Sequence, residues 1–245
     1  DAETGSLKVL LDNYSALDYL KKLTSVSDTD NGAYVCMVNE LTHKSFFLQA
    51  PDYVPVKTVT DRGTSKFKDN DDYATQMAAF KMIGTWLSYL KENGAYDNTR
   101  IVIVSDHGCW GTEDDMEPNA ALDEEISGGS YAGRGHYHPL LLFKDFNAAG
   151  MLTEDDTFMT NADTPSLLLK GIIEKPVNPF TEKSVPLDTS VLKKDGVIIS
   201  VNDRHQTYMN GKYKFNIPPS HWWKVKDNIF KASNWSRAEE KEIQQ

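Results

Sequence analysis

The stretch that decides the fold is "YATQMAAFKMIGTWLSYLKENGAYDNTRIVIVSDHG", residues 73 to 108. In its first part apolar residues recur at intervals of three and four, which predicts an amphipathic helix from 71 to 92 that ends at Asn93 and Gly94. In its second part, residues 101 to 105 ("IVIVS") do not alternate between apolar and polar, as is typical of a strand covered on both faces. A long helix leading into such a strand favours an α/β protein with a parallel sheet.

Two further apolar runs extend the predicted sheet. Residues 33 to 39 and residues 139 to 143 ("PLLLF") have the length and composition of buried strands. With the strand near 101 to 105, they predict an αβα sandwich whose central sheet is mostly parallel. The helix from 72 to 92 is expected to pack on one face of that sheet.

The pattern of apolar and polar residues changes near residue 185. Short strand-like pieces then alternate with turns such as the one at Asn210 and Gly211, a pattern typical of antiparallel sheets. We therefore expect two parts: an α/β catalytic domain over residues 1–185, lacking its N-terminal portion, and a small antiparallel subdomain over residues 186–245.

Composition and charge exclude several classes of protein. The formal net charge of -10 argues against a general nucleic-acid binder, which needs a basic face for phosphates. No run approaches about 18 consecutive apolar residues, so we expect the chain itself to be soluble. Cys36 and Cys109 belong to no CxxC pattern, which excludes a cysteine-rich zinc site. A local metal or anion site remains compatible with the acidic total.

Asp106 and His107 stand at the carboxyl end of the predicted strand 101 to 105. Ligands of open α/β sheets bind beyond the carboxyl ends of the strands. A carboxylate and a neutral imidazole are both good ligands for Zn²⁺ or Mn²⁺, and Gly108 permits a sharp turn behind them. The alternative is that Asp106 caps a turn and His107 lies on the surface, because two adjacent ligands do not by themselves define a site.

Other polar residues next to apolar runs are candidates for the same site. His43 closes the run that begins at residue 33, and His136 and His138 precede the run at 139 to 143. His43 could instead be a loop histidine bonded to the backbone. His136 and His138 are two residues apart, which would place both on one face of a strand, although Pro139 disfavours a regular strand there. Together the three histidines favour one shared site with Asp106 and His107. Arg62 lies in a long polar loop, where it could bind a phosphate or sulfate oxyanion or be solvated.

Three segments resemble one protein family. The helix, turn and strand of residues 73–108 resemble the metal-binding segment of the alkaline phosphatase superfamily. "NELTHKSFF" (39–47) and "YHPLLLFKDFNAAG" (137–150) are similar to its sulfatase-like branch, which includes membrane-bound sulfatases, lipoteichoic acid synthases and phosphoethanolamine transferases. The resemblance implies that Asp106 and His107 bind a divalent metal, Mn or Zn, with Ca or Mg as alternatives.

The resemblance also implies an activity and a location. It assigns His43, and His136 or His138, to the substrate side of a site that hydrolyses or transfers phosphate or sulfate esters, either small molecules or lipid-linked. Such enzymes lie on the extracytoplasmic face of the membrane, where upstream transmembrane helices tether them. The branch's nucleophile motif, C/S-x-P-x-R, is absent from these 245 residues. We therefore expect the nucleophile and an acidic ligand to precede residue 1, and this chain alone to be inactive.

Two alternatives remain open at this stage. One is a two-metal relative that resembles phosphoglycerate mutases or nucleotide pyrophosphatases, although it would need further Asp and His ligands. The other is a catalytically degenerate sulfatase-like domain that binds a lipid headgroup or a protein partner. A Thr or Ser nucleophile together with an acidic ligand in the upstream gene sequence would favour the enzyme, and their loss would favour the binding domain.

Overall fold

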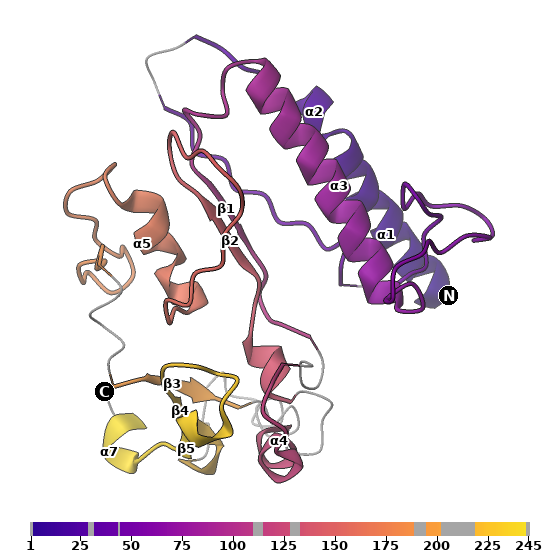
Figure 1. The fold of residues 1–245 in the computed structure, drawn as a ribbon. Helices are drawn as coiled ribbons and strands as arrows, with labels where there is room; N and C mark the ends of the chain where they lie inside the picture. The colour runs from indigo at the N-terminus through magenta and orange to yellow at the C-terminus, as the bar shows by residue number, and fades with distance from the viewer. Residues whose placement is uncertain are drawn as a thin grey trace. The chain divides into compact units, whose positions relative to one another are not determined.

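The computed structural model describes residues 2–28, 32–43, 45–109, 115–127, 133–188, 195–201 and 219–243. The chain divides into two compact units, residues 1–99 and residues 100–245 (Figure 1). A hydrophobic core lies in each unit. The sequence-based boundary at residues 185 and 186 lies inside the second unit, and the predicted division into a catalytic domain and a subdomain stays a prediction.

The first unit is built on helices. α1 (Ala2–Asp18), α2 (Leu20–Leu23) and α3 (Asp71–Glu92) pack together, with α3 contacting both of the others. α3 has the bounds that the apolar period predicts. It begins where the Asn70 side chain accepts a hydrogen bond from the backbone N–H of Tyr73 at 3.2 Å, and it ends at Asn93, before Gly94 with φ +68°.

Residues 33 to 39 do not form the buried strand that their composition predicts. Tyr34, Val35 and Val38 are 77%, 84% and 85% exposed, and the segment is not assigned to a strand. A strand is held by backbone hydrogen bonds to a neighbouring strand. The described residues of the first unit contain no strand that could pair with this segment, so its apolar composition alone does not place it in a sheet.

Two strands of the second unit carry the segments that flank the candidate site. β1 (Ile101–Val104) and β2 (Leu141–Lys144) form at the predicted positions, but they pair antiparallel, with Val104 opposite Leu141. The prediction of a parallel arrangement is wrong for this pair. The two strands are antiparallel because the chain leaves β1 at its carboxyl end and enters β2 beside that same end. The N–H of Ser105, just after β1, donates to the carbonyl of Leu140, just before β2, at 3.0 Å. A parallel pair would need a crossover to the other end of the sheet.

The helix within that connection is not a crossover helix. α4 (Ala120–Ser127) places Ile126, which is 1% exposed, in the core of the C-terminal sheet. That sheet is antiparallel with the order β3 (Val197–Ser200), β4 (Trp222–Val225) and β5 (Trp235–Arg237). Its core includes Trp223 and Trp235. The prediction of a small antiparallel sheet near the C-terminus is therefore confirmed, while the predicted turn at Asn210 and Gly211 lies outside the described residues.

Shorter elements complete the second unit: η1 (Arg134–Tyr137), η2 (Asn161–Asp163), α5 (Thr164–Leu169), η3 (Pro219–His221), η4 (Ala232–Asn234) and α7 (Glu240–Ile243). The protein thus mixes helices with small antiparallel sheets. Within the described ranges, no helix is both long enough and apolar enough to span a membrane.

Candidate functional site

The backbone that carries Asp106 and His107 is held from two sides. The hydroxyl of Ser105 accepts a hydrogen bond from the N–H of Leu140 at 2.8 Å and donates to the carbonyl of His107 at 2.9 Å. The Asn161 amide, in η2, donates to the carbonyls of Ser105 at 2.9 Å and Asp106 at 3.2 Å. These contacts fix the turn that follows β1, because the Ser105 hydroxyl closes the turn on itself while Leu140 and Asn161 tie it to two other segments.

Gly108 brings η1 against this turn. Its N–H donates to the carbonyl of His136 at 2.9 Å. A Cβ added at Gly108 would lie 2.1 Å from the carbonyl oxygen of Gly135 and 2.4 Å from that of His138, so only a glycine leaves room for η1 here. The rings of His107 and His136 consequently stack, with centroids 4.3 Å apart and planes 30° apart.

The bonding of His107 suits its ring to metal binding. Its Nδ1 lies 2.8 Å from the carbonyl oxygen of Gly108. A carbonyl oxygen only accepts, so this contact fits a ring that is protonated at Nδ1. A second partner of this kind orients the ring of metal-binding histidines. Nε2 is 3.8 Å from Oδ2 of Asp106. Two atoms that bind one Zn²⁺ at about 2.1 Å with tetrahedral angles lie about 3.4 Å apart, so the pair is about 0.4 Å wider than a shared ion requires.

The pair is accessible but incomplete as a metal site. The Asp106 side chain is 90% exposed and that of His107 is 35% exposed. A zinc site takes at least three protein ligands, and across the described ranges no three His, Cys, Asp or Glu side chains surround a common point. The His136 ring lies against the His107 ring, with the two planes tilted by 30°.

His138 is directed to a different neighbour. It is exposed, and its ring meets that of Phe230 edge-on at 4.9 Å. His136 belongs to the single turn of η1, while His138 follows that turn and β2 begins only at Leu141. The two histidines therefore do not share a strand face, consistent with the restriction that Pro139 places on a strand.

His43 and Arg62 belong to the first unit. His43 is exposed in a turn, where its N–H donates to the carbonyl of Glu40 at 3.1 Å. The guanidinium of Arg62 lies 3.6 Å from the centroid of the Phe47 ring and 3.4 Å from Asp69. The structure thus brings His136 to Asp106 and His107, whereas a site shared with His43 or Arg62 stays a prediction.

Sequence reasoning missed the residues that hold the site together. Ser105, Asn161 and Arg134 act through contacts with segments distant in the sequence. The strand end and the histidines gave a signal, but nothing beside Asn161 in the sequence marks it as a partner of the turn at Asp106.

Comparisons of the chain with models of protein families, with curated proteins and with solved structures gave no match. The likeness in three sequence segments and the geometry of the second unit are therefore the basis of the functional proposal.

Proposed function

We propose that this chain contributes the carboxyl end of β1 to a metal-dependent site that hydrolyses or transfers phosphate or sulfate esters. The enzyme would belong to the sulfatase-like branch of the alkaline phosphatase superfamily. The main support is the orientation of His107, whose Nδ1 is bonded to the Gly108 carbonyl while Nε2 lies 3.8 Å from the Asp106 carboxylate. That is the arrangement expected of two adjacent metal ligands.

Each candidate residue has a proposed role. Asp106 and His107 would hold the ion, Mn or Zn, with Ca or Mg as alternatives. When bound, the ion neutralises negative charge on the transferred group. His136 keeps the His107 ring in place through the stacked contact. His43 and His138 are proposed for the substrate side, where an imidazole can protonate a leaving oxygen. Arg62 is a weaker candidate for binding an oxyanion.

The proposal requires residues beyond these 245. A third ligand and a hydroxyl or thiol nucleophile would come from elsewhere in a larger enzyme with the superfamily's αβα sandwich and mostly parallel sheet. That enzyme would act on small-molecule or lipid-linked esters outside the cytoplasmic membrane, to which other helices would tether it. The sequence resemblance supports this part of the proposal.

A comparison of two forms tests it: the chain alone, and the gene product extended at its N-terminus. Each is incubated with Mn²⁺ or Zn²⁺ and with p-nitrophenyl phosphate or sulfate. We expect turnover only from the extended form, and a loss of roughly 100-fold or more in Asp106→Ala, because even the outer partners of metal ligands are worth about 10- to 100-fold. Asp97→Ala is the matched control, since Asp97 is an exposed carboxylate outside the site.

The outcomes separate the alternatives. Full activity of the extended Asp106→Ala variant would contradict the metal-ligand role. Turnover by the chain alone, lost in Asp106→Ala, would place the nucleophile within these residues. An inactive extended form that binds vesicles bearing anionic headgroups would favour the degenerate binding domain.

A further inference from the structure

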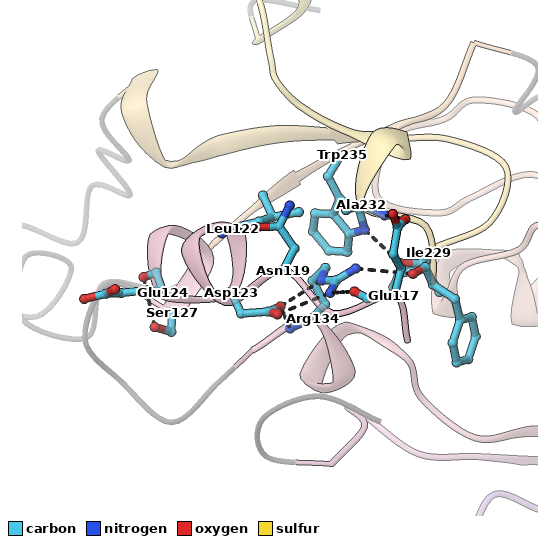
Figure 2. A network of polar contacts seen from close by, with 11 residues as sticks. Glu117, Asn119, Leu122, Asp123, Glu124, Ser127, Arg134, Ile229, Ala232 and Trp235 are labelled. Carbon is cyan, nitrogen blue, oxygen red and sulfur yellow. Dashed lines mark hydrogen bonds and ion pairs between the residues drawn. The ribbon is translucent and has the colours of Figure 1, made fainter. Parts of the chain in front are cut away.

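A fully buried arginine lies beside the candidate site. Arg134, the first residue of η1, is 0% exposed. Its guanidinium bonds both oxygens of Asp123, with Nε at 2.7 Å from Oδ1 and Nη2 at 3.2 Å from Oδ2. The same group donates to the carbonyls of Glu117 and Phe230 (Figure 2). One side chain therefore joins η1 to three other segments.

Those segments also bond one another around the guanidinium. The N–H of Glu117 donates to the carbonyl of Phe230 at 3.0 Å, and the Glu117 carboxylate accepts from the N–H of Ala232 at 3.0 Å. Asp123 lies in α4, and it also accepts from the backbone N–H of Arg134 at 3.4 Å. Figure 2 shows Arg134 where α4, the segment at Glu117 and the loop before β5 meet.

η1 links Arg134 to the candidate site, because the same short helix carries His136. Two residues after Arg134, the carbonyl of His136 accepts the Gly108 N–H, and its ring stacks on that of His107. The carbonyls of Gly135 and His138 lie so near Gly108 that even a Cβ does not fit between. In contacts this close, a shift of about 1 Å forfeits much of the van der Waals attraction.

We infer that Arg134 is a positioning residue, which with Asp123 holds η1 so that His136 packs against the ring of His107. A role of Arg134 in catalysis rests on the proposed function. The positioning of η1 by Arg134 is independent of that function. The role needs an arginine, because the planar fork bonds a carboxylate with two nitrogens and still reaches two carbonyls. A lysine keeps the charge but offers only a point donor.

The test measures the His107–His136 contact directly. The whole chain, labelled with ¹³C and ¹⁵N at histidine, is studied by NMR, with signals assigned through His107→Gln and His136→Gln. In the wild type we expect a nuclear Overhauser effect between the two rings and upfield shifts from their stacking. Arg134→Lys should lose both, at a temperature where the dispersed indole signals show that the fold persists.

Arg100→Lys is the matched control. Arg100 is also a buried arginine, with a side chain 8% exposed, paired with Asp145 and bonded to the carbonyls of Leu168 and Lys170. A merely structural effect of losing an arginine would appear in both variants. We expect the ring contact to survive in Arg100→Lys.

Retention of the ring contact in folded Arg134→Lys would overturn the inference. If that variant does not fold, Asp123→Asn decides, because it weakens the same pair while keeping the shape of the side chain; an unchanged contact there would equally overturn it. The readout needs no turnover, so it is independent of the Asp106→Ala assay that tests the proposed function.

Discussion

Replacing Gly108 with alanine tests the packing on which the candidate site depends. The new methyl group would lie 2.1 Å from the carbonyl oxygen of Gly135, more than about 1 Å inside ordinary contact, and 2.4 Å from that of His138. Both obstacles are backbone atoms, so η1 itself must move. Forcing an extra methyl into a packed site costs about 1–3 kcal/mol. Loss of the bond from Gly108 to His136 adds about 0.5–1.5 kcal/mol.

The expected change in the free energy of unfolding is therefore about 1.5–4.5 kcal/mol, a large share of the roughly 5–15 kcal/mol of a typical domain. Urea unfolding followed by circular dichroism and tryptophan fluorescence measures it. Gly84→Ala is the control with the opposite sign. A Cβ there would meet nothing within 4 Å beyond its chain neighbours and the adjacent helix backbone, so alanine in the middle of α3 should stabilise by about 0.5–1 kcal/mol.

A Gly108→Ala protein within about 0.5 kcal/mol of the wild type would refute this reasoning, since changes of that size are usual for surface positions that contact nothing. The result would mean that η1 does not rest on Gly108. The stacked contact between His107 and His136 would then lose its structural support.

Two further predictions concern the second unit. Burial opposes ionisation of Asp145, but the hydrogen bonds from Arg100 and the Phe146 N–H outweigh it and hold the pKa of the carboxyl below its usual value. The pair thus stabilises the fold above about pH 4, and this stabilisation is lost as the pH falls through the lowered pKa. Arg100→Met should cost about 1–3 kcal/mol at pH 7, and in urea unfolding its deficit should shrink towards pH 3; an undiminished deficit would contradict the pairing. Trp235→Phe removes the indole bond to the carbonyl of Ile229 at 2.9 Å and should cost about 1–3 kcal/mol, so an unchanged urea midpoint would argue against this core contact.

Local signals predicted the elements that depend on local interactions. α3 follows from its apolar period and from the glycine after its end, and the cap at Asn70 is added by the structure. The antiparallel C-terminal sheet follows from short strand-like pieces separated by turns. These signals are local: the apolar period marks the helix and the short apolar pieces mark the strands, although β3 and β4 pair over a long separation, with Val197 opposite Val225.

The pairing of β1 with β2 depends on non-local information. The apolar runs mark both strands, but they are equally compatible with parallel and antiparallel pairing. What decides is where β2 begins: the N–H of Ser105 bonds the carbonyl of Leu140, so β2 starts beside the end of β1. α4, which lies between the two strands in the sequence, packs on the C-terminal sheet. The same limit applies to residues 33 to 39, whose composition suits a strand although the described part of the first unit offers no partner strand.

In the candidate site too, some features follow from local sequence and others depend on contacts between distant segments. Asp106, His107 and His136 were named from the sequence because polar residues at the ends of apolar runs are visible there. The support for these side chains comes from a close backbone approach at Gly108 and from a buried charge at Arg134. A glycine in the sequence does not reveal which carbonyl it approaches, and an arginine is usually exposed.

Energetics distinguish the role of Arg134 from that of the apolar core. Burying a charged pair costs several kcal/mol per ion in desolvation, and well-packed apolar residues of the same size often stabilise a fold equally or better. Stability alone therefore does not account for an arginine at 0% exposure, since Trp223 and Trp235 already supply apolar burial nearby. An apolar side chain forms no directional hydrogen bonds, so it cannot bond Asp123 and two carbonyls in one fixed geometry. That geometry sets where η1 begins, and η1 carries the ring that packs on His107.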